Sequence, residues 1–411
     1  MIDQKNNTTK DRERLAQTFL KPLATRYRLF LGIADTILRP MALHFPARSS
    51  AESGSSENIL IFDPGLLGDM MMLVPFLQNL AAYYPKSRIC LFGRPGVADT
   101  LLAKGLIHEL LPVSIPWGHQ ASRWKRNNPL SFNWLRFFKN VYGLRNRHFD
   151  LGFASGWGGD LRGNFVLWLA GVNKRVGYGY AGGKYFLSDI ATPDLGRPHV
   201  VDRNLQLLSH LGIPVVPFHE ALPLAENVEE SVKGLLTQHG ISSQDLIIGI
   251  HPGAGAKIRE WGDERFAEVA NRLTSRFGAK VIWFVDPHKP KPLPKGLNVV
   301  PLSLSLSELE AVLSNCKLFI CNDSGPMHLA AALKVPVVAI FGAQRPEWFG
   351  PWGEGHRVVI RNDVWCRPCA DNCIFDEPHC LRLISVDQVM NQAEQALKNL
   401  TPSYRAATTV L

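Results

Sequence analysis

Short apolar runs alternate with helix-length segments along most of this chain, and this alternation restricts its fold more than any other feature. The apolar runs 58–63 and 88–93 flank a helical segment at 68–84, and the same pattern starts again near residue 246. Strands that alternate with helices of this length form parallel sheets with crossover helices. The sequence therefore predicts an α/β fold.

The alternation is interrupted once, by a proline-punctuated segment near residues 213–225. We therefore expect two Rossmann-like domains with parallel sheets facing a central cleft, at 57–215 and 216–411. Residues 1–56 precede them as a basic, mostly polar extension that ends in a Ser/Gly/Glu linker. Its amphipathic stretch at 27–45 fits either an anionic membrane face or a helix packed on the body.

The composition is that of a globular protein with an anionic partner. Of the 411 residues, 46% are hydrophobic and 20% are charged, which argues against disorder. The formal charge of +9 favours nucleic acid, anionic lipid or a phosphorylated small molecule. Basic residues are spread along the chain without a recognised nucleic-acid module, so we expect no nucleic-acid partner. The first residues do not resemble a signal peptide and no apolar run reaches membrane-spanning length, so we expect a cytoplasmic protein.

Seven cysteines are distributed unevenly. Cys90, Cys316 and Cys321 lie in or beside apolar segments, as buried thiols do. The others gather in one C-terminal segment that also contains His379, a substitute ligand: Cys366, Cys369, Cys373 and Cys380. Close thiols in an intracellular chain suggest a metal, so one prediction is a structural zinc or similar metal there. The other is reduced thiols that pack an irregular loop.

Three loops that follow predicted strands combine glycine with polar residues, at 63–69, 251–261 and 322–328. In open parallel sheets, ligands bind beyond the carboxyl ends of the strands, so these loops form the candidate site. In the third loop, Asp323 or Ser324 can cap the helix that follows. The free N–H groups and the dipole at the start of that helix predict an anion site.

Several well-known nucleotide and nucleophile motifs are missing. The segment 177–185 is close to a P-loop but has Tyr178 where the first glycine should stand, and Tyr185 where Ser or Thr should follow the lysine. The second loop supplies only the first two glycines of G-x-G-x-x-G, and Ser155 and Ser324 lack the first glycine of G-x-S-x-G. These departures weigh against a kinase, a dehydrogenase and a serine hydrolase.

Five segments resemble, in order, the successive signatures of glycosyltransferase family 9: residues 65–93, 169–179, 199–208, 251–270 and 321–351. The resemblance runs from about residue 58 to the C-terminus and includes the cysteine-rich segment, whereas the N-terminal extension is not part of it. The best-known members are ADP-heptose:lipopolysaccharide heptosyltransferases. Membership implies a GT-B architecture, with an acceptor domain at 57–215 and a sugar-nucleotide domain at 216–411.

The resemblance also implies the donor site. In this family the third loop holds the nucleotide phosphates, and these contacts carry over to Asp323, Ser324, Gly325, Pro326, Met327 and His328. The second loop adds His251 and Gly253. Where the family often has a lysine two residues before a tryptophan, this chain has Arg259, with Lys257 two residues earlier. Either cation can stabilise the leaving diphosphate.

The general base implied by the resemblance is Asp69, which follows Gly68 on the acceptor side. A carboxylate at a helix N-terminus is ordinarily a cap with a lowered pKa, but closure of a dry cleft can raise its basicity. Asp63 is the alternative base. Arg162 and Arg175 can bind phosphates of the acceptor, or they are surface and salt-bridged arginines.

We therefore predict an inverting glycosyltransferase with heptose from ADP-heptose as the first candidate donor and a lipid-linked saccharide, such as a lipopolysaccharide core, as acceptor. The scheme requires no cofactor, since the chain lacks the D-x-D motif that holds a metal against a sugar nucleotide. The basic charge suits work at the anionic face of the inner membrane. Two alternatives stay open: a nucleotide-sugar-binding protein without turnover, and a family member that uses another donor sugar.

Overall fold

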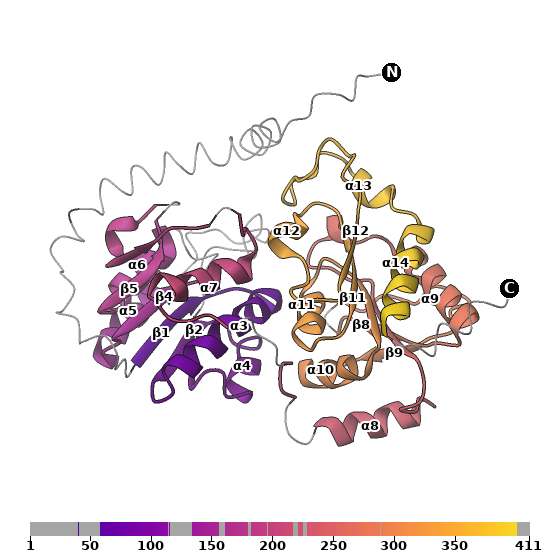
Figure 1. Ribbon diagram of the computed structural model, residues 1–411, viewed down its shortest axis with the longest axis horizontal. Helices are drawn as coiled ribbons and strands as arrows, with labels where there is room; N and C mark the ends of the chain where they lie inside the picture. Colours follow the sequence, from indigo (N-terminus) through magenta and orange to yellow (C-terminus); the bar gives the residue numbers. More distant parts are fainter. Residues whose placement is uncertain are drawn as a thin grey trace.

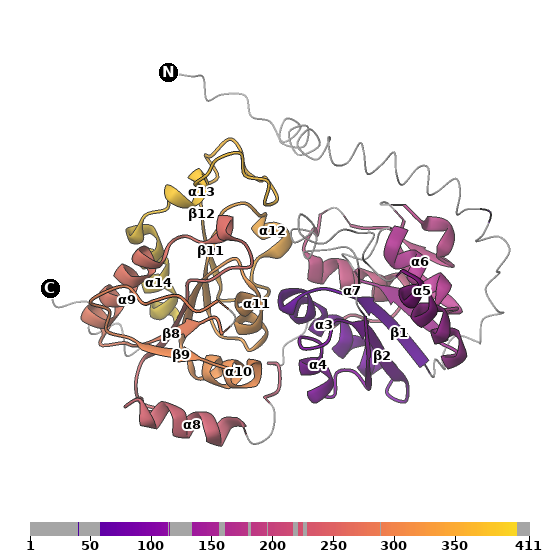
Figure 2. The ribbon, with the colours of Figure 1, turned by 180° about the vertical axis from the view of Figure 1, so that it is seen from behind.

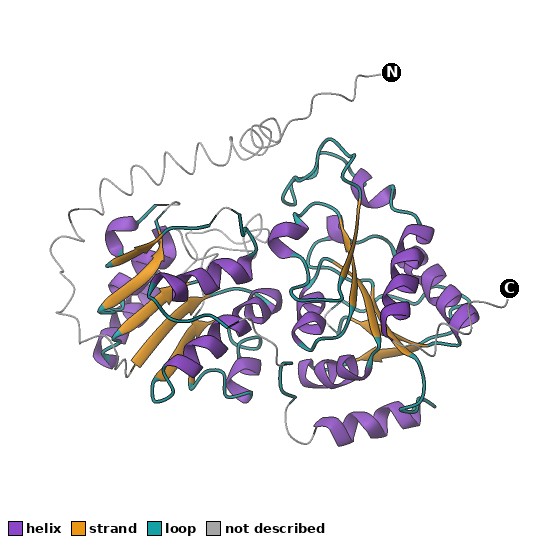
Figure 3. Ribbon diagram, in the orientation of Figure 1, coloured by secondary structure: helices purple, strands orange, loops and turns teal. Residues whose placement is uncertain are grey.

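The computed structural model describes Pro40 and residues 58–400, apart from 114, 116–133, 156–160, 180–181, 195, 217–220, 225–227 and 288. Apart from Pro40, the predicted N-terminal extension lies outside the described residues, and so does part of the proline-punctuated segment at 213–225. Two α/β halves lie side by side, and each is built around its own parallel sheet (Figure 1). Helices cover both faces of each sheet (Figure 3).

The first half has the strands β1 (Asn58–Asp63), β2 (Arg88–Gly93), β3 (Glu109–Pro112), β4 (Leu151–Ala154), β5 (Lys174–Tyr178) and β6 (Asp189–Ala191). Its helices are α3 (Leu67–Tyr83), α4 (Asp99–Ala103), α5 (Trp134–Gly143), α6 (Leu161–Leu169) and α7 (Val200–His210). Two short 3-10 turns are η3 (Leu144–Arg147) and η4 (Lys184–Phe186). The strands predicted at 58–63 and 88–93 and the helix predicted at 68–84 are confirmed.

The second half has the strands β7 (Ile247–His251), β8 (Lys280–Val285), β9 (Val300–Ser303), β10 (Leu318–Asn322), β11 (Val337–Phe341) and β12 (Arg357–Ile360). Its helices are α8 (Val228–Gln238), η5 (Lys257–Arg259), α9 (Asp263–Phe277), α10 (Leu306–Asn315), α11 (Gly325–Ala332), α12 (Pro346–Phe349), α13 (His379–Arg382) and α14 (Val386–Leu400). The restart of the alternation near residue 246 is therefore confirmed.

Both sheets have the same topology. The strand order is β3-β2-β1-β4-β5-β6 in the first sheet and β12-β11-β10-β7-β8-β9 in the second. Read from its other edge, the second order repeats the first, which is that of a Rossmann fold. The chain direction across each sheet reverses between β1 and β4 and between β7 and β10. These two switch points are where ligands bind in such sheets, and the predicted α/β fold with two Rossmann-like units is confirmed.

Side chains of β1 alternate between two apolar layers, as the two-residue period of a strand requires. Ile59 and Ile61 belong to the core formed with α3 and α7, whereas Leu60 and Phe62 belong to the core formed with α5 and α6. A strand buried on both faces is apolar along nearly its whole length, and this is why the strand at 58–63 could be predicted from the sequence.

The two halves pack on each other through α3 and α11. Buried residues of α3, α7, α10 and α11 form one continuous apolar cluster, and α3 and α11 are neighbours in both views (Figure 1 and Figure 2). Lys104, just after α4, forms a 2.7 Å ion pair with Glu310 of α10, and both side chains are almost fully buried. This buried ion pair joins the two halves, and removal of either partner alone would leave the other charge buried and unpaired.

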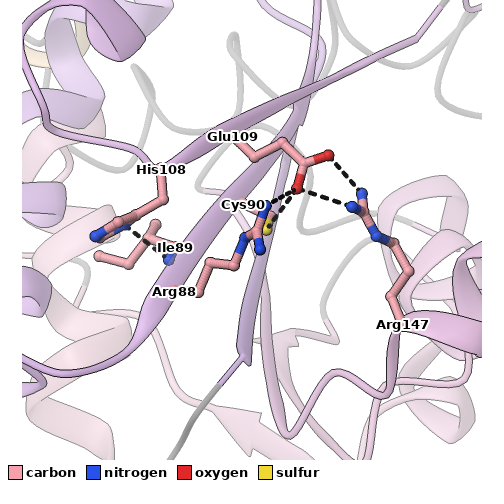
Figure 4. Close-up of polar contacts among 6 residues, drawn as sticks. All are labelled: Arg88, Ile89, Cys90, His108, Glu109 and Arg147. Carbon is pink, nitrogen blue, oxygen red and sulfur yellow. Dashed lines mark hydrogen bonds and ion pairs between the residues drawn. The ribbon is translucent and has the colours of Figure 1, made fainter.

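The amino edge of the first sheet carries an ion-pair cluster. Glu109 accepts hydrogen bonds from Arg88, at the start of β2, and from both terminal nitrogens of Arg147 in η3, at 2.7 and 2.9 Å (Figure 4). The paired geometry of Arg147 fixes η3 against the sheet. These charges bind one another at the edge of the sheet opposite the switch-point loops, which lie at its carboxyl edge.

Candidate active site

The first loop joins β1 to α3 at the switch point of the first sheet. Asp63 ends β1, and its Oδ1 accepts a hydrogen bond of 2.8 Å from the N–H of Gly65. Asp69, in the first turn of α3, accepts one of 2.7 Å from the N–H of Leu66. The side chain of Asp69 folds back over the turn, since a Cβ at Gly65 would lie 2.3 Å from the Cβ of Asp69. Two consecutive backbone N–H groups of one turn thus each donate a hydrogen bond to a carboxyl group.

Asp63 is almost completely buried. Burial raises the pKa of Asp63 to about 7, and the neighbouring Asp69 carboxyl adds to this rise, while the Ser155 hydroxyl and the Gly65 amide oppose it. Ser155 directly follows β4, which pairs with β1 across the switch point. A carboxyl that titrates near neutrality at such an edge is suited to proton chemistry.

The third loop, between β10 and α11, holds a polar group with unused hydrogen-bonding capacity. Ser324 occupies the N-cap position of α11, yet its side chain makes no capping hydrogen bond. Of the two residues that the sequence offered as caps, Ser324 therefore occupies the cap position without making the capping hydrogen bond. Its buried hydroxyl has no hydrogen-bond partner in the part of the chain that the structure describes. Buried polar atoms without partners are rare in native proteins, so this hydroxyl points to a ligand.

The first and third loops touch each other. A Cβ at Gly68 would lie 2.8 Å from Cδ2 of His328, and one at Gly325 would lie 3.2 Å from the Cβ of Leu67. Glycine at both positions permits this close approach. Burial lowers the pKa of His328 to about 3, so its ring is neutral. The structure therefore brings the predicted base and the predicted diphosphate loop together.

Pro326 and Met327, also in the predicted donor loop, can offer a ligand little beyond their backbone atoms. Pro326 lies in the first turn of α11, where a missing N–H costs no hydrogen bond. The side chain of Met327 is fully buried in the apolar core. Met327 can therefore offer a ligand only its backbone.

The second loop supplies Arg259, which lies between two carboxylates. Its Nη1 is 3.3 Å from Oδ2 of Asp323, and its Nε donates a 2.8 Å hydrogen bond to Asp371, which also binds Nη2. Burial alone would lower the pKa of Arg259, but Asp371, Asp323 and Asp69 raise it, so the guanidinium stays charged. Lys257 is exposed. Of the two predicted cations, Arg259 is the one that the structure places beside the anion loop.

His251 and Gly253 also lie at the carboxyl edge of the second sheet. His251 ends β7, and burial lowers its pKa to about 4, so the ring is neutral. Its buried Nδ1 has no hydrogen-bond partner within the described residues. A Cβ at Gly253 would lie 3.1 Å from this ring, so the loop passes directly over it.

Sequence reasoning missed two residues that connect these loops. Asn322, the buried last residue of β10, accepts a 3.1 Å hydrogen bond from the N–H of Trp261 and donates one of 2.6 Å to the carbonyl of Pro252. The sequence did contain a signal for this role, because Asn322 is a polar amide side chain at the end of an otherwise apolar strand. Asp371 lies 112 residues from Arg259 in the sequence, and no local pattern indicates their contact.

The structure does not bring Arg175 to the site. Arg175 is buried in β5, and its guanidinium donates to the carbonyls of Phe186, Val172 and Asn173 at 2.5, 2.7 and 3.1 Å. Since it binds the backbone inside the first half, its predicted contact with acceptor phosphates is not supported. Arg162, in the first turn of α6, stays a prediction.

The four C-terminal cysteines give no support to the predicted zinc. All four lie within the described residues, where no group of three or more His, Cys, Asp or Glu side chains is arranged to hold a metal ion. Each is a free thiol, and burial raises the pKa of Cys369 to about 11. Cys366 and Cys380 belong to the apolar core of the second half. These thiols pack the segment from which Asp371 reaches Arg259.

The two switch points together define a class of protein. Two Rossmann-like halves that pack on each other, with carboxylates at one switch point and an arginine and a helix start at the other, are the architecture of a GT-B glycosyltransferase. The family model for glycosyltransferase family 9 (heptosyltransferase) matches residues 136–378. This chain belongs to glycosyltransferase family 9, and the resemblance seen in the sequence is confirmed.

Relatives and solved structures cover most of the chain. The lipooligosaccharide heptosyltransferase 2 of Campylobacter jejuni subsp. jejuni serotype O:2 is 31% identical over 354 residues, which are 83% of this chain and 98% of that protein. The lipopolysaccharide heptosyltransferase 2 of Escherichia coli K12 is 26% identical over 318 residues, 73% of this chain and 87% of that protein.

The likeness extends to the fold of solved structures. The glycosyl transferase family 9 protein from Veillonella parvula has a TM-score of 0.65 at 23% identity and covers 85% of this chain and 100% of its own. The E. coli ADP-heptose lps heptosyltransferase II has a TM-score of 0.61 at 22% identity and covers 83% and 99%. The GT-B architecture is therefore confirmed.

Proposed function

We propose that this protein is an inverting heptosyltransferase that moves heptose from ADP-heptose to a hydroxyl of a lipopolysaccharide-type saccharide. Family membership and the names of the relatives support heptose transfer and the acceptor class, and the name of the E. coli structure supports ADP-heptose as donor. The observation that carries the proposal is the buried Ser324 hydroxyl, which lacks a partner among the described residues and lies in the loop that contacts the Asp69 loop. In this proposal residues 57–215 bind the acceptor and 216–411 bind the donor.

Asp69 is the proposed general base. The acceptor hydroxyl gives its proton to the Asp69 carboxylate while its oxygen bonds to the anomeric carbon of the donor. The bond from that carbon to the diphosphate breaks, and its electron pair leaves with ADP. A single displacement of this kind inverts the anomeric configuration. The hydrogen bond from Leu66 holds the carboxylate in a fixed orientation, which favours the attack geometry.

The leaving diphosphate needs positive charge where its own negative charge develops. The N–H groups at the start of α11 supply part of it, and the Ser324 hydroxyl can donate one further hydrogen bond. Arg259 supplies a full charge in a planar fork that suits phosphate oxygens. Because Asp371 already binds two of its nitrogens, the diphosphate must share or displace that pair.

We also propose that the protein works on the cytoplasmic side, at the anionic face of the inner membrane. The surface of α5 supports this. Phe137 and Val141 are the buried residues of α5, and Leu135 is 85% exposed. The large apolar side chains that α5 exposes are Trp134, Leu135, Phe138 and Tyr142. Arg136 and Lys139 are exposed on the same helix, and this mixture suits an anionic lipid surface. In the described part of the molecule, no helix has the length and hydropathy to cross a bilayer.

The donor proposal is tested by thermal shift with ADP, UDP, GDP and CMP, because a ligand that binds only the folded protein raises its apparent stability. Selective stabilisation by ADP supports the proposal. A preference for UDP or GDP would keep the transferase and replace the donor sugar. Release of ADP from ADP-heptose in the presence of heptose-deficient lipopolysaccharide then separates an enzyme from a binding protein without turnover.

The membrane proposal is tested by sedimentation with vesicles of phosphatidylglycerol or phosphatidylcholine. We expect binding to the anionic vesicles, and we expect Leu135→Glu to weaken it. Ile374→Glu is the matched control, since Ile374 is 65% exposed in the other half of the molecule. Equal binding of both variants and the unmodified protein would contradict a role for α5.

A further inference from the structure

We propose that Asp63 is a positioning residue that sets the basicity of Asp69 through its own ionisation. This inference rests on the proposed role of Asp69 as the base. When Asp63 carries a negative charge, the proton affinity of Asp69 rises and transfer is fast. When Asp63 holds a proton, Asp69 is a weaker base and transfer is slow.

The geometry of the β1–α3 turn couples the two carboxyl groups. Asp63 binds the N–H of Gly65 at 2.8 Å and Asp69 binds the N–H of Leu66 at 2.7 Å, so the carboxyls are held on neighbouring amides. Asp63 is 3% exposed. Because Asp63 is shielded from water, its electrostatic interaction with the half-buried Asp69 is stronger than between two exposed carboxylates.

Asp69 needs such help because its own surroundings make it a poor base. It lies in the first turn of α3, where the helix dipole favours the charged carboxylate, and it accepts a hydrogen bond from a backbone amide. Arg259, on the facing loop, also interacts with Asp69 as an opposite charge. All three effects lower its proton affinity, and a negative charge at Asp63 acts in the opposite direction.

The groups around Asp63 bring its titration close to neutral pH, where enzyme activity can be measured. Burial raises the pKa of Asp63 to about 7 and Asp69 adds to the rise, whereas the Ser155 hydroxyl at the end of β4 and the Gly65 amide lower it. Asp63 therefore changes charge near neutral pH, where a change of rate can be measured. A purely structural carboxyl would leave no such mark on the pH dependence of turnover.

The test is the pH dependence of kcat for transfer from ADP-heptose to heptose-deficient lipopolysaccharide. We expect the rate to rise from a lower to a higher plateau through about pH 7. Asp63→Asn should stay near the lower plateau and lose the inflection. Ser155→Ala should move the inflection to higher pH, because the hydroxyl that lowers the pKa of Asp63 is gone.

Asp150→Asn is the matched control. Asp150 accepts a 3.1 Å hydrogen bond from the N–H of Asn58, so it also binds a backbone amide of β1, but at the opposite edge of the sheet. We expect its profile to keep the inflection. If Asp63→Asn does not fold, the shift with Ser155→Ala carries the test, and an unmoved inflection overturns the inference.

The outcomes separate this inference from the proposed function. If Asp69→Asn retains full turnover, the proposed base is wrong and the inference falls with it. If Asp69→Asn is inactive while Asp63→Asn keeps both the upper plateau and the inflection, only the inference falls. If Asp63→Asn is inactive and Asp69→Asn is active, Asp63 itself is the base and both are overturned.

Discussion

The two switch points share one topology and have opposite chemistry. At the first, β1 ends in Asp63 and leads to Asp69, so the edge holds two carboxyl groups. At the second, β7 ends in the neutral His251, and Arg259 lies beside the start of α11, where the Ser324 hydroxyl has no partner among the described residues. Equal strand order therefore determines where each loop lies, and the side chains of the loop determine which ligand it suits.

The difference in charge also means that each edge disfavours the ligand that the other edge binds. A diphosphate at the first edge would face Asp69 and an ionised Asp63, and like charges at such distances cost several kcal/mol. At the second edge, the cation and the helix start favour an anion. These charges agree with the proposed orientation of the transfer, in which the first half accepts the proton and the second half holds the diphosphate.

The largest expected effect comes from removing the proposed base at the first switch point. Asp69→Asn should lower kcat by about 10²–10⁴-fold, the usual contribution of a general base, and leave ADP affinity unchanged. The measurements are steady-state transfer and ADP titration by calorimetry. An unchanged kcat would remove the proton-accepting role from the first edge.

The control for this variant lies in the same half. Asp99, in the first turn of α4, accepts a 2.6 Å hydrogen bond from the N–H of Gly96, three residues before it, just as Asp69 does from Leu66. Asp99→Asn therefore alters the same local interaction away from the site. We expect it to keep full turnover.

Asp63→Asn should have the next largest effect, on stability. The pKa of Asp63 is about 7 in the folded protein and about 3.8 without the fold, so the folded state holds more protons between these values. The free energy of unfolding then falls by up to about 4 kcal/mol as pH rises through this window. Above the window it no longer changes with the charge of Asp63. Relative to the unmodified protein, Asp63→Asn should be more stable at pH 8 and similar near pH 4. Urea unfolding at both values tests this, and equal stabilities at pH 8 would show that Asp63 is not buried as a charge.

The contrast between the two edges could be predicted only in part from the sequence. The strands at 58–63 and 88–93 were visible because a strand buried on both faces is almost continuously apolar. The loops followed from the ends of those strands, and the base and donor loop from the resemblance. Contacts between distant segments were not visible: Asp371 to Arg259 depends on how the cysteine-rich segment folds back, and the backbone contacts of Arg175 depend on η4. The sequence left two roles open for Ser324, a helix cap and a phosphate contact, because both roles use the same residue type.

Arg259→Gln should weaken ADP binding by about 10–100-fold, since hydrogen bonds to charged groups contribute about 1.5–3 kcal/mol. Lys257→Gln is the control, because Lys257 is exposed in the same 3-10 turn, and we expect less than about a threefold change.

Asp371→Asn sharpens the comparison: if the diphosphate competes with Asp371 for the guanidinium, ADP should bind more tightly to this variant. Equal losses in Arg259→Gln and Lys257→Gln would mean that loop charge in general, and not the position of Arg259, holds the anion.

The smallest expected effect distinguishes a ligand contact from a helix cap. Ser324 and Ser305 both occupy N-cap positions, but only Ser305 accepts a hydrogen bond from its helix, from the N–H of Glu308. Ser305→Ala should lower the free energy of unfolding by about 1 kcal/mol and leave ADP affinity unchanged. Ser324→Ala should do the reverse: unfolding of the free protein stays the same, and ADP binds about 3–10-fold more weakly for the loss of one hydrogen bond. Calorimetric titration and urea unfolding of both variants decide it, and a Ser324→Ala protein that is destabilised with unchanged ADP affinity would return Ser324 to the role of a cap.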